Sequence, residues 1–248
     1  MRLLAVVVGT WHSGDMDIRG VEHPLIRRAA EALHNFNSRH PWSHNDHFHR
    51  WILANLPARR GTAIDIGCGQ GALVAQLAAQ FTHVRGTDLD PGMRAEAARR
   101  CADLTNVTID DSQLAQLDGP VDLVTMIAVL HHLDVEQALT DITRLLAPGG
   151  RFLCVGLAAP ASIRDTAWDL ASAVTNPIIG LIKHPRPVRS GPQPPPFPVR
   201  DPQLSFDEMR AIVDRVMPGA EMRHRLAFRH TIRWTKPGEA TQRNAAPK

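Results

Sequence analysis

Apolar residues along the chain occur either in short continuous runs or at helical spacing, and the two patterns alternate between residues 62 and 157. The runs have the length of strands, and the segments between them place apolar residues three or four positions apart, as in Leu73, Leu77 and Phe81. Strands that alternate with helices are joined by right-handed crossovers into a parallel sheet covered on both faces. The predicted strands are AIDIG, THVRGTDLD, NVTID, VDLVTMI and RFLCVGL. We therefore expect an α/β, Rossmann-like, doubly wound fold with its ligand at the carboxyl ends of the strands.

Helical spacing also flanks this core. It predicts a helix over residues 21–37, a short one from Ser43 towards Leu56, and an apolar one over residues 161–183. Asp90, which is followed by Pro91, and Asp134 are each predicted to cap the start of a helix in the core. A capping box, Ser205-Phe-Asp-Glu208, predicts the start of a further helix.

Two strands at about residues 220–227 and 229–235 follow, and they predict an antiparallel pair that completes a mostly parallel, seven-stranded sheet. Residues 183–202 are too rich in proline for regular structure and are expected to pack as an extended loop over the domain. We expect one domain, 1–248, with five parts: an N-terminal helical lid (1–60), a ligand-binding core (61–157), a helix and proline-rich insertion (158–204), a C-terminal helix and strand pair (205–237) and a disordered tail (238–248).

The composition fits this expectation, because 248 residues with 44% hydrophobic content can build one sizeable core. The three cysteines form no CxxC pair, so they indicate neither a disulfide framework nor a zinc site, and no metal is expected. No apolar run has the length of a secretory signal or a membrane span, so we expect a cytoplasmic protein without a membrane partner. Met1 and Met16 both fit as starting residues.

The charge is uneven: residues 183–248 hold 13 Lys and Arg against 6 Asp and Glu, whereas the net charge of the whole chain is only +3. A basic segment can attract nucleic acid. Here the basic residues are separated by proline and apolar residues and form no run, which favours a solvated surface.

A glycine-rich turn, Asp65-Ile-Gly67-Cys68-Gly69-Gln-Gly71, follows the first predicted strand. Its glycines let the backbone approach a ligand closely. The third glycine comes one residue too early for the G-x-G-x-x-G dinucleotide fingerprint, and no Gly-Lys-Ser/Thr phosphate loop is present. The second strand ends at Asp88, where a carboxylate can accept hydrogen bonds from both hydroxyls of a ribose.

These features occur in a familiar order. AIDIGCGQG, GTDLDPGM, the acidic cluster Asp110-Asp111-Ser112, VDLVTMIAVLHHL and LLAPGGRF follow one another over residues 62–157. The chain resembles the class I S-adenosylmethionine-dependent methyltransferases in this series. NDHFHRWILANLP and PGAEMRHRLAFRHTIRW resemble the corresponding segments of small-molecule, natural-product members of that family. The resemblance implies a Rossmann-like enzyme with S-adenosyl-L-methionine as cofactor, present as a monomer or homodimer.

The same resemblance implies roles for single residues. Gly67, Cys68, Gly69 and Gly71 would form the loop along the methionine part and ribose of the cofactor, with Asp65 supporting the loop or the amino group. Asp88 would hold the ribose diol and Leu89 would pack on the adenine. Asp111, or its neighbour Asp110, would accept the adenine amino group beside Ser112, and Ile127 would face the cofactor.

The stretch WSHNDHFHRWI places three histidines within six residues. In a helix of about 100° per residue, His44 and His47 share a face whereas His49 points away, so the three do not converge on a metal. The resemblance instead implies a lid. Asn45 and His49 would cover the cofactor, and His47, Phe48 and Trp51, together with Trp168 of the later apolar helix, would face the substrate.

Methyl transfer from a sulfonium needs a nucleophile held in line, and a base helps when the acceptor is a hydroxyl or a protonated amine. His131 and His132 follow the fourth strand and are the candidate bases, although in many relatives such histidines pack or cap a helix. Met126-Ile127-Ala128-Val129 replaces the Asn/Asp-Pro-Pro-aromatic motif of enzymes that methylate amino groups of nucleic-acid bases. The sequence therefore favours a small-molecule acceptor and no nucleic-acid partner. The alternatives are an RNA methyltransferase that uses the basic C-terminal third and a non-catalytic S-adenosylmethionine-binding module.

Overall fold

The computed structural model describes residues 47–159, 202–226 and 229–238. The chain divides into two compact units, one formed by residues 45–157, 207–223 and 230–248 and the other by residues 1–44, 158–206 and 224–229. The predicted helices over residues 21–37 and 161–183, the proline-rich insertion, Asn45 and Trp168 lie outside the described residues.

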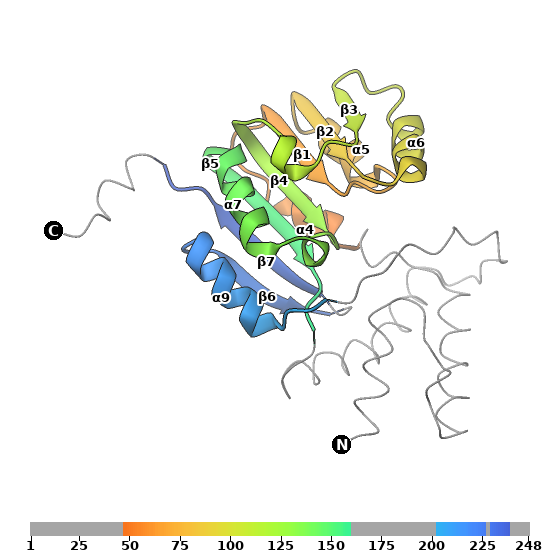
Figure 1. Ribbon diagram of the computed structural model, residues 1–248. Helices are drawn as coiled ribbons and strands as arrows, with labels where there is room; N and C mark the ends of the chain where they lie inside the picture. Colours follow the sequence, from red (N-terminus) through yellow and green to blue (C-terminus); the bar gives the residue numbers. More distant parts are fainter. Residues whose placement is uncertain (1–46, 160–201, 227–228, 239–248) are drawn as a thin grey trace, which may run out of the picture. The chain divides into compact units, whose positions relative to one another are not determined.

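A seven-stranded sheet organises the first of these units, and its strand order is β3-β2-β1-β4-β5-β7-β6 (Figure 1). β1 pairs in parallel with β2 and β4, whereas β5 pairs with β7 in antiparallel fashion. This confirms the predicted α/β fold with its antiparallel C-terminal strands. The strands span Thr62–Ile66 (β1), His83–Thr87 (β2), Val107–Asp110 (β3), Val121–Ile127 (β4), Leu146–Gly156 (β5), Glu221–Arg225 (β6) and Arg229–Thr235 (β7).

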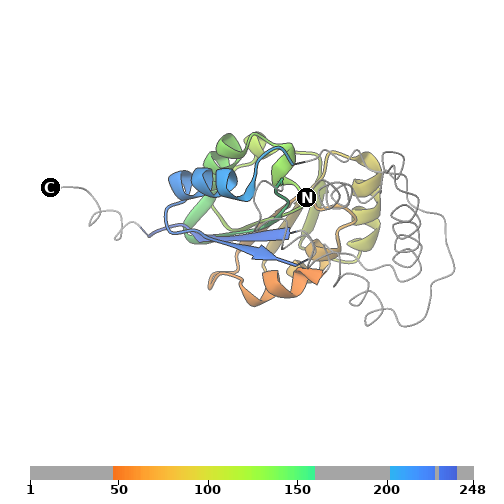
Figure 2. The same ribbon diagram turned by 90° about the horizontal axis from the view of Figure 1, so that it is seen from below.

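Helices cover both faces of the sheet. Figure 2 shows α7 and α9 on one face and α4 on the opposite face. On the α4 face, Ile52 packs with Leu73, Val74 and Leu77 of α5 in one buried apolar cluster. Burial on both sides explains why β1 and β4 consist almost entirely of buried residues. The helices are α4 (His49–Ala54), α5 (Ala72–Ala78), α6 (Pro91–Arg100), α7 (Val135–Leu145) and α9 (Phe206–Val216), with two short 3-10 helices, η2 (Leu114–Gln116) and η3 (Leu130–His132).

Two helices begin at the predicted caps. The Asp90 carboxylate accepts a hydrogen bond from the backbone N–H of Met93, and Pro91 occupies the first position of α6. The Asp134 carboxylate does the same for the N–H of Gln137 at the start of α7. Both caps fix the start of a helix beside the carboxyl ends of the strands.

The fifth strand differs from its prediction, which placed its start at Arg151 after a turn. β5 begins at Leu146, and its register against β4 shifts between the Val121–Leu146 and Leu123–Arg151 pairs. The extra residues include Gly149, whose φ of 79° is left-handed and whose N–H donates to the carbonyl of Lys236. The turn is therefore an irregular part of a longer strand.

In the second unit, Ala159 pairs with Ser205 in a parallel bridge, and the ring of Phe206 stacks on that of His224 with centroids 3.6 Å apart. Among the helices of the described ranges, none has the length and apolar character needed to cross a bilayer.

Candidate functional site

Three residues of the glycine loop have a left-handed backbone conformation with positive φ. Gly67, Gly69 and Gly71 have φ values of 68°, 53° and 75°, which side chains rarely tolerate. A Cβ on Gly67 would lie 2.2 Å from Cγ2 of Val129, so this glycine allows the loops after β1 and β4 to touch. A Cβ on Gly69 would meet nothing within 4 Å. The loop thus presents open space at Gly69 and a tight contact at Gly67.

Cys68 turns its side chain inward. A Cβ on Gly86 of β2 would lie 3.1 Å from the Cys68 sulfur, so the thiol packs against that strand. Burial first, and then the charges of Asp65 and Asp88, raise the pKa of this thiol, which therefore stays protonated and unreactive. Only the backbone of Cys68 is suited to follow a ligand.

Asp88 ties the end of β2 to the glycine loop. Its Oδ2 accepts a hydrogen bond of 2.8 Å from the N–H of Gly69, and its Oδ1 accepts one of 2.9 Å from the N–H of Asp90. Each carboxylate oxygen can accept a further hydrogen bond. The carboxylate is therefore held in one orientation with capacity left for two donors of a ligand.

Asp65 lies at the end of β1 and is only 3% exposed. Thr125 of β4 donates its hydroxyl hydrogen to Oδ1 of Asp65 over 2.6 Å. The pKa of Asp65 is raised to about 7 as the net result of three effects: burial raises it most, the hydrogen bond from Thr125 lowers it, and the like charge of Asp88 raises it. This carboxylate therefore changes its charge near neutral pH.

The Asp65→Asn variant is expected to be more stable than the parent protein above pH 7. Between the ordinary pKa of 3.8 and about 7, the folded protein holds a proton that the unfolded chain has lost, so the stability of the parent falls as pH rises through this window. Above pH 7 the ionised Asp65 destabilises the parent protein by the full amount, at most about 4 kcal/mol. Urea unfolding of both proteins at pH 5 and pH 8 should show the full advantage of Asn at pH 8 and roughly a third of it at pH 5. An equal difference at both values would contradict the prediction.

The acidic residues after β3 have separate partners. Arg85 of β2 donates to Oδ2 of Asp110 at 2.7 Å and to the hydroxyl of Ser112 at 2.7 Å. Partial burial raises the pKa of Asp110, but the hydrogen bonds from Arg85 and Ser112 outweigh burial, so the pKa lies below its ordinary value. The Asp111 side chain is 71% exposed and lies 3.6 Å from a guanidinium nitrogen of Arg94. Asp110 is therefore committed to the protein, and Asp111 is the more accessible carboxylate.

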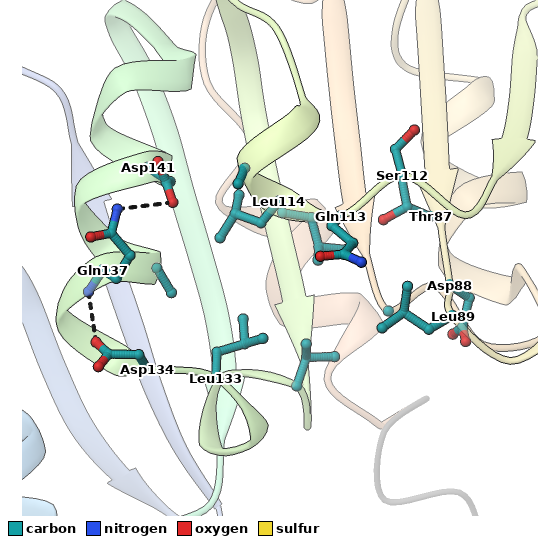
Figure 3. Close-up of a pocket in the computed structure, with 15 residues that line it drawn as sticks. Thr87, Asp88, Leu89, Ser112, Gln113, Leu114, Leu133, Asp134, Gln137 and Asp141 are labelled. Atoms are coloured by element: carbon teal, nitrogen blue, oxygen red, sulfur yellow. Dashed lines mark hydrogen bonds between the residues drawn. The ribbon is translucent and has the colours of Figure 1, made fainter.

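A cavity of about 270 Å³ opens at the carboxyl ends of β1, β2 and β4. In Figure 3, Asp88 and Leu89 lie on one side of it, Gln137 and Asp141 of α7 lie on the other, and Gln113 and Leu114 lie between them. Leu89 is 67% and Leu133 37% exposed, which makes them apolar parts of this lining that face solvent. The lining comprises Ile66, Gly67, Thr87, Asp88, Leu89, Ser112, Gln113, Leu114, Ala115, Val129, Leu133, Asp134, Gln137, Ala138 and Asp141.

Four of the residues predicted from the sequence line this cavity: Gly67, Asp88, Leu89 and Ser112. The other predicted cofactor-site residues among the described ones are not part of the lining: Asp65, Cys68, Gly69, Gly71, Asp110, Asp111 and Ile127. Several lining residues were not predicted from the sequence, among them Gln113, Val129, Leu133, and Gln137 and Asp141 of α7. The sequence offered one signal for some of them: Gln113 directly follows Ser112, Leu133 directly follows His132, and Gln137 lies in the first turn of the helix that Asp134 caps.

The candidate bases lie just beyond β4. Ala128 takes a left-handed φ of 58° and donates its N–H to the carbonyl of Val155 at 2.7 Å, which ends the strand after the half-buried Ile127. His131 and His132 follow in η3, with ring centroids 4.0 Å apart. His132 is exposed and His131 is half-buried. Both are near the cavity in sequence, since Val129 and Leu133 line it.

The described part of the lid segment packs mainly on the core. Phe48 is buried, Trp51 is half-buried against the same apolar cluster, and His47 is exposed. His49 is 7% exposed, and its Nδ1 lies 2.9 Å from Nε2 of Gln76 on α5. These four residues lie outside the cavity lining. Within the described ranges, no group of three or more His, Cys, Asp or Glu side chains is arranged to hold a metal ion.

A glycine loop beside a carboxylate held by backbone N–H groups, at the carboxyl ends of parallel strands, is typical of nucleoside-binding α/β domains. The family model of the methyltransferase domain matches residues 64–152. An uncharacterized methyltransferase of Mycobacterium tuberculosis is 31% identical over 204 residues, which cover 79% of this chain and 98% of the relative. The chain belongs to the class I S-adenosylmethionine-dependent methyltransferases, and it is an enzyme of that class.

More distant relatives carry names of specific methyltransferases. A demethylmenaquinone methyltransferase of Tropheryma whipplei is 29% identical over 154 residues, 59% of this chain and 64% of the relative. The solved structure of magnesium protoporphyrin IX methyltransferase from Synechocystis with bound SAH has a TM-score of 0.50 at 21% identity and covers 94% of this chain and 99% of its own. A methyltransferase structure from Mesorhizobium loti has a TM-score of 0.51 at 19% identity, with 75% and 96% covered. These two structures share the fold.

Proposed function

We propose that this protein transfers the methyl group of S-adenosylmethionine to an oxygen, nitrogen or carbon atom of a small aromatic or heterocyclic metabolite. The observation that carries the proposal is the cavity between Asp88 and α7, since it joins a fixed carboxylate to a mostly apolar lining. The demethylmenaquinone methyltransferase among the relatives supports a small-molecule acceptor rather than a macromolecule. The end of β4, Ile127-Ala128-Val129, supports it as well, because the motif that grips a flipped base is absent there.

The residues of the site fit the cofactor. Both oxygens of Asp88 are oriented by backbone N–H groups and can each accept a ribose hydroxyl. The open space before Gly69 leaves room for the chain that links ribose and sulfonium. Leu89 exposes an apolar side chain on which adenine can stack, and Ser112 with the accessible Asp111 lies where the adenine edge would be read. When bound, S-adenosylmethionine supplies a methyl group on a positively charged sulfur.

The protein's own contribution is to orient the acceptor, exclude water and accept a proton. In-line displacement gains most from a fixed geometry of the reacting atoms. His132 and His131 are the nearest histidines after β4, and histidine changes its charge close to neutral pH. We assign the role of general base to one of these two histidines, and we favour His132 because its side chain is exposed whereas His131 is half-buried.

Replacing His132 with Ala should lower kcat by about 100-fold, the usual contribution of a positioned base, with little change in cofactor affinity. The matched control is His83→Ala, because His83 is exposed at the opposite end of the sheet, where β2 begins. Turnover with the identified acceptor, and calorimetry with S-adenosylmethionine, measure the two effects. Full activity of the His132 variant would place the base elsewhere or show that the acceptor needs none.

The proposed function is tested in two stages. Calorimetry with S-adenosylmethionine and its demethylated product comes first, with micromolar-range binding expected, as is typical of intracellular enzymes. Transfer of a labelled methyl group is then screened against aromatic and heterocyclic metabolites and, in parallel, against bulk RNA at several salt concentrations. Methylation of RNA alone, with a steep salt dependence, would replace the small-molecule proposal. Binding without transfer to any acceptor would indicate a non-catalytic module.

A further inference from the structure

Thr125 is a polar residue between apolar neighbours in the central strand β4. Its neighbours Val124 and Met126 are fully buried, and Thr125 itself has no exposed surface. Burying a hydroxyl is costly unless the group is hydrogen-bonded. The strand register brings Thr125 opposite Asp65, and the hydroxyl donates to Oδ1 over 2.6 Å. The carbonyl of Ile64 lies farther away, at 3.4 Å, so the single hydroxyl hydrogen goes to the carboxylate.

The surroundings of Asp65 work against its ionised form. Burial is the largest effect, and the charged neighbour that acts on it is Asp88, another carboxylate, on the end of the next strand. Cys68 faces it from the glycine loop, but its thiol stays protonated. Thr125 on β4 acts in the opposite direction, because a donated hydrogen bond favours the charged carboxylate. Two carboxylates at adjacent strand ends suit a ligand that carries positive charge.

We propose that Thr125 is a positioning residue for cofactor binding, which holds the Asp65 carboxylate in the orientation and charge state required by the cationic cofactor. The inference rests on the proposed function, since it needs S-adenosylmethionine in this site. Binding of a cation beside Asp65 selects the ionised carboxylate, so the proton held by the free protein passes to the buffer. Affinity therefore falls as pH decreases below neutrality. Removal of the hydroxyl makes ionisation harder and shifts this fall to higher pH.

The experiment measures the dissociation constant of S-adenosylmethionine by calorimetry between pH 6 and pH 9 for the parent protein, Thr125→Val and Thr125→Ser. Valine has nearly the shape of threonine and favours strands, whereas serine keeps the hydroxyl. Because the amino group of the ligand itself titrates near pH 8, the result is the displacement between variants rather than the shape of one profile. Repeating the titrations in buffers of different ionisation enthalpy counts the protons released.

The midpoint of the affinity profile should move up by about one pH unit in Thr125→Val, as expected for a lost hydrogen bond to a charged group, and should stay at its original value in Thr125→Ser. The Val variant then binds roughly tenfold more weakly at pH 6.5 and like the parent at pH 9. Equal weakening at every pH, or superimposable profiles, would overturn the inference and leave Thr125 as a packing residue. Absence of binding by the parent protein at every pH would instead contradict the proposed function.

Discussion

The Asp88→Ala variant is expected to bind S-adenosylmethionine at least about 100-fold more weakly than the parent protein, because hydrogen bonds to a charged group contribute about 1.5–3 kcal/mol each. The substitution removes two acceptors for the ribose hydroxyls. It also removes the acceptor for the N–H of Gly69, which the carboxylate holds at 2.8 Å. Loss of this contact frees the glycine loop, so ligand ordering becomes more costly. Calorimetry at pH 8, where the neighbouring Asp65 is mostly ionised, measures the effect.

Asp90→Ala is the matched control for this prediction. Asp90 is a carboxylate two residues further along the chain, and its side chain caps α6 by accepting from Met93. Its backbone N–H, which donates to Asp88, survives the substitution. The control should lose about 1 kcal/mol of stability, as lost caps do, and keep its affinity for the cofactor. If both variants bind the cofactor equally well, the ribose does not lie at Asp88.

Local sequence signals were sufficient for the elements that surround the site. VDLVTMI predicted β4 with both of its ends, and the caps at Asp90 and Asp134 set the starts of α6 and α7, because each depends on residues within one turn. The same holds for the glycine loop and the position of Asp88. The start of β5 was predicted too late in the chain. Its first residues pair with β4 through an irregular register, which a local sequence pattern does not encode.

The remaining site features depend on contacts between distant residues. The distinction between Asp110 and Asp111 required Arg85, 25 positions earlier than Asp110, to occupy the first of them. The bond between Thr125 and Asp65 spans 60 positions and follows from the parallel register of β1 and β4. The α7 residues of the cavity lining were missed for the same reason, because only the sheet order brings that helix beside the end of β2.

The cofactor affinity of the Gly69→Ala variant is expected to fall by at least about 100-fold, whereas its stability should fall by only about 1–2 kcal/mol. The stability cost comes from the left-handed φ of 53°, since the added methyl group meets no protein atom within 4 Å. The affinity loss comes from that same open space, because the methyl group would occupy the region assigned to the cofactor.

Gly149→Ala separates the two effects. Gly149 has a similar left-handed φ of 79° and equally open surroundings, but it lies at the irregular start of β5, where α7 ends, and not in the loop after β1. We expect the same loss of stability in urea and an unchanged dissociation constant. Gly67→Ala should behave differently from both, because its methyl group would clash with Val129 at 2.2 Å and reduce folding as well as binding. Cofactor binding by Gly69→Ala within threefold of that by Gly149→Ala would show that the cofactor does not run along the backbone at Gly69.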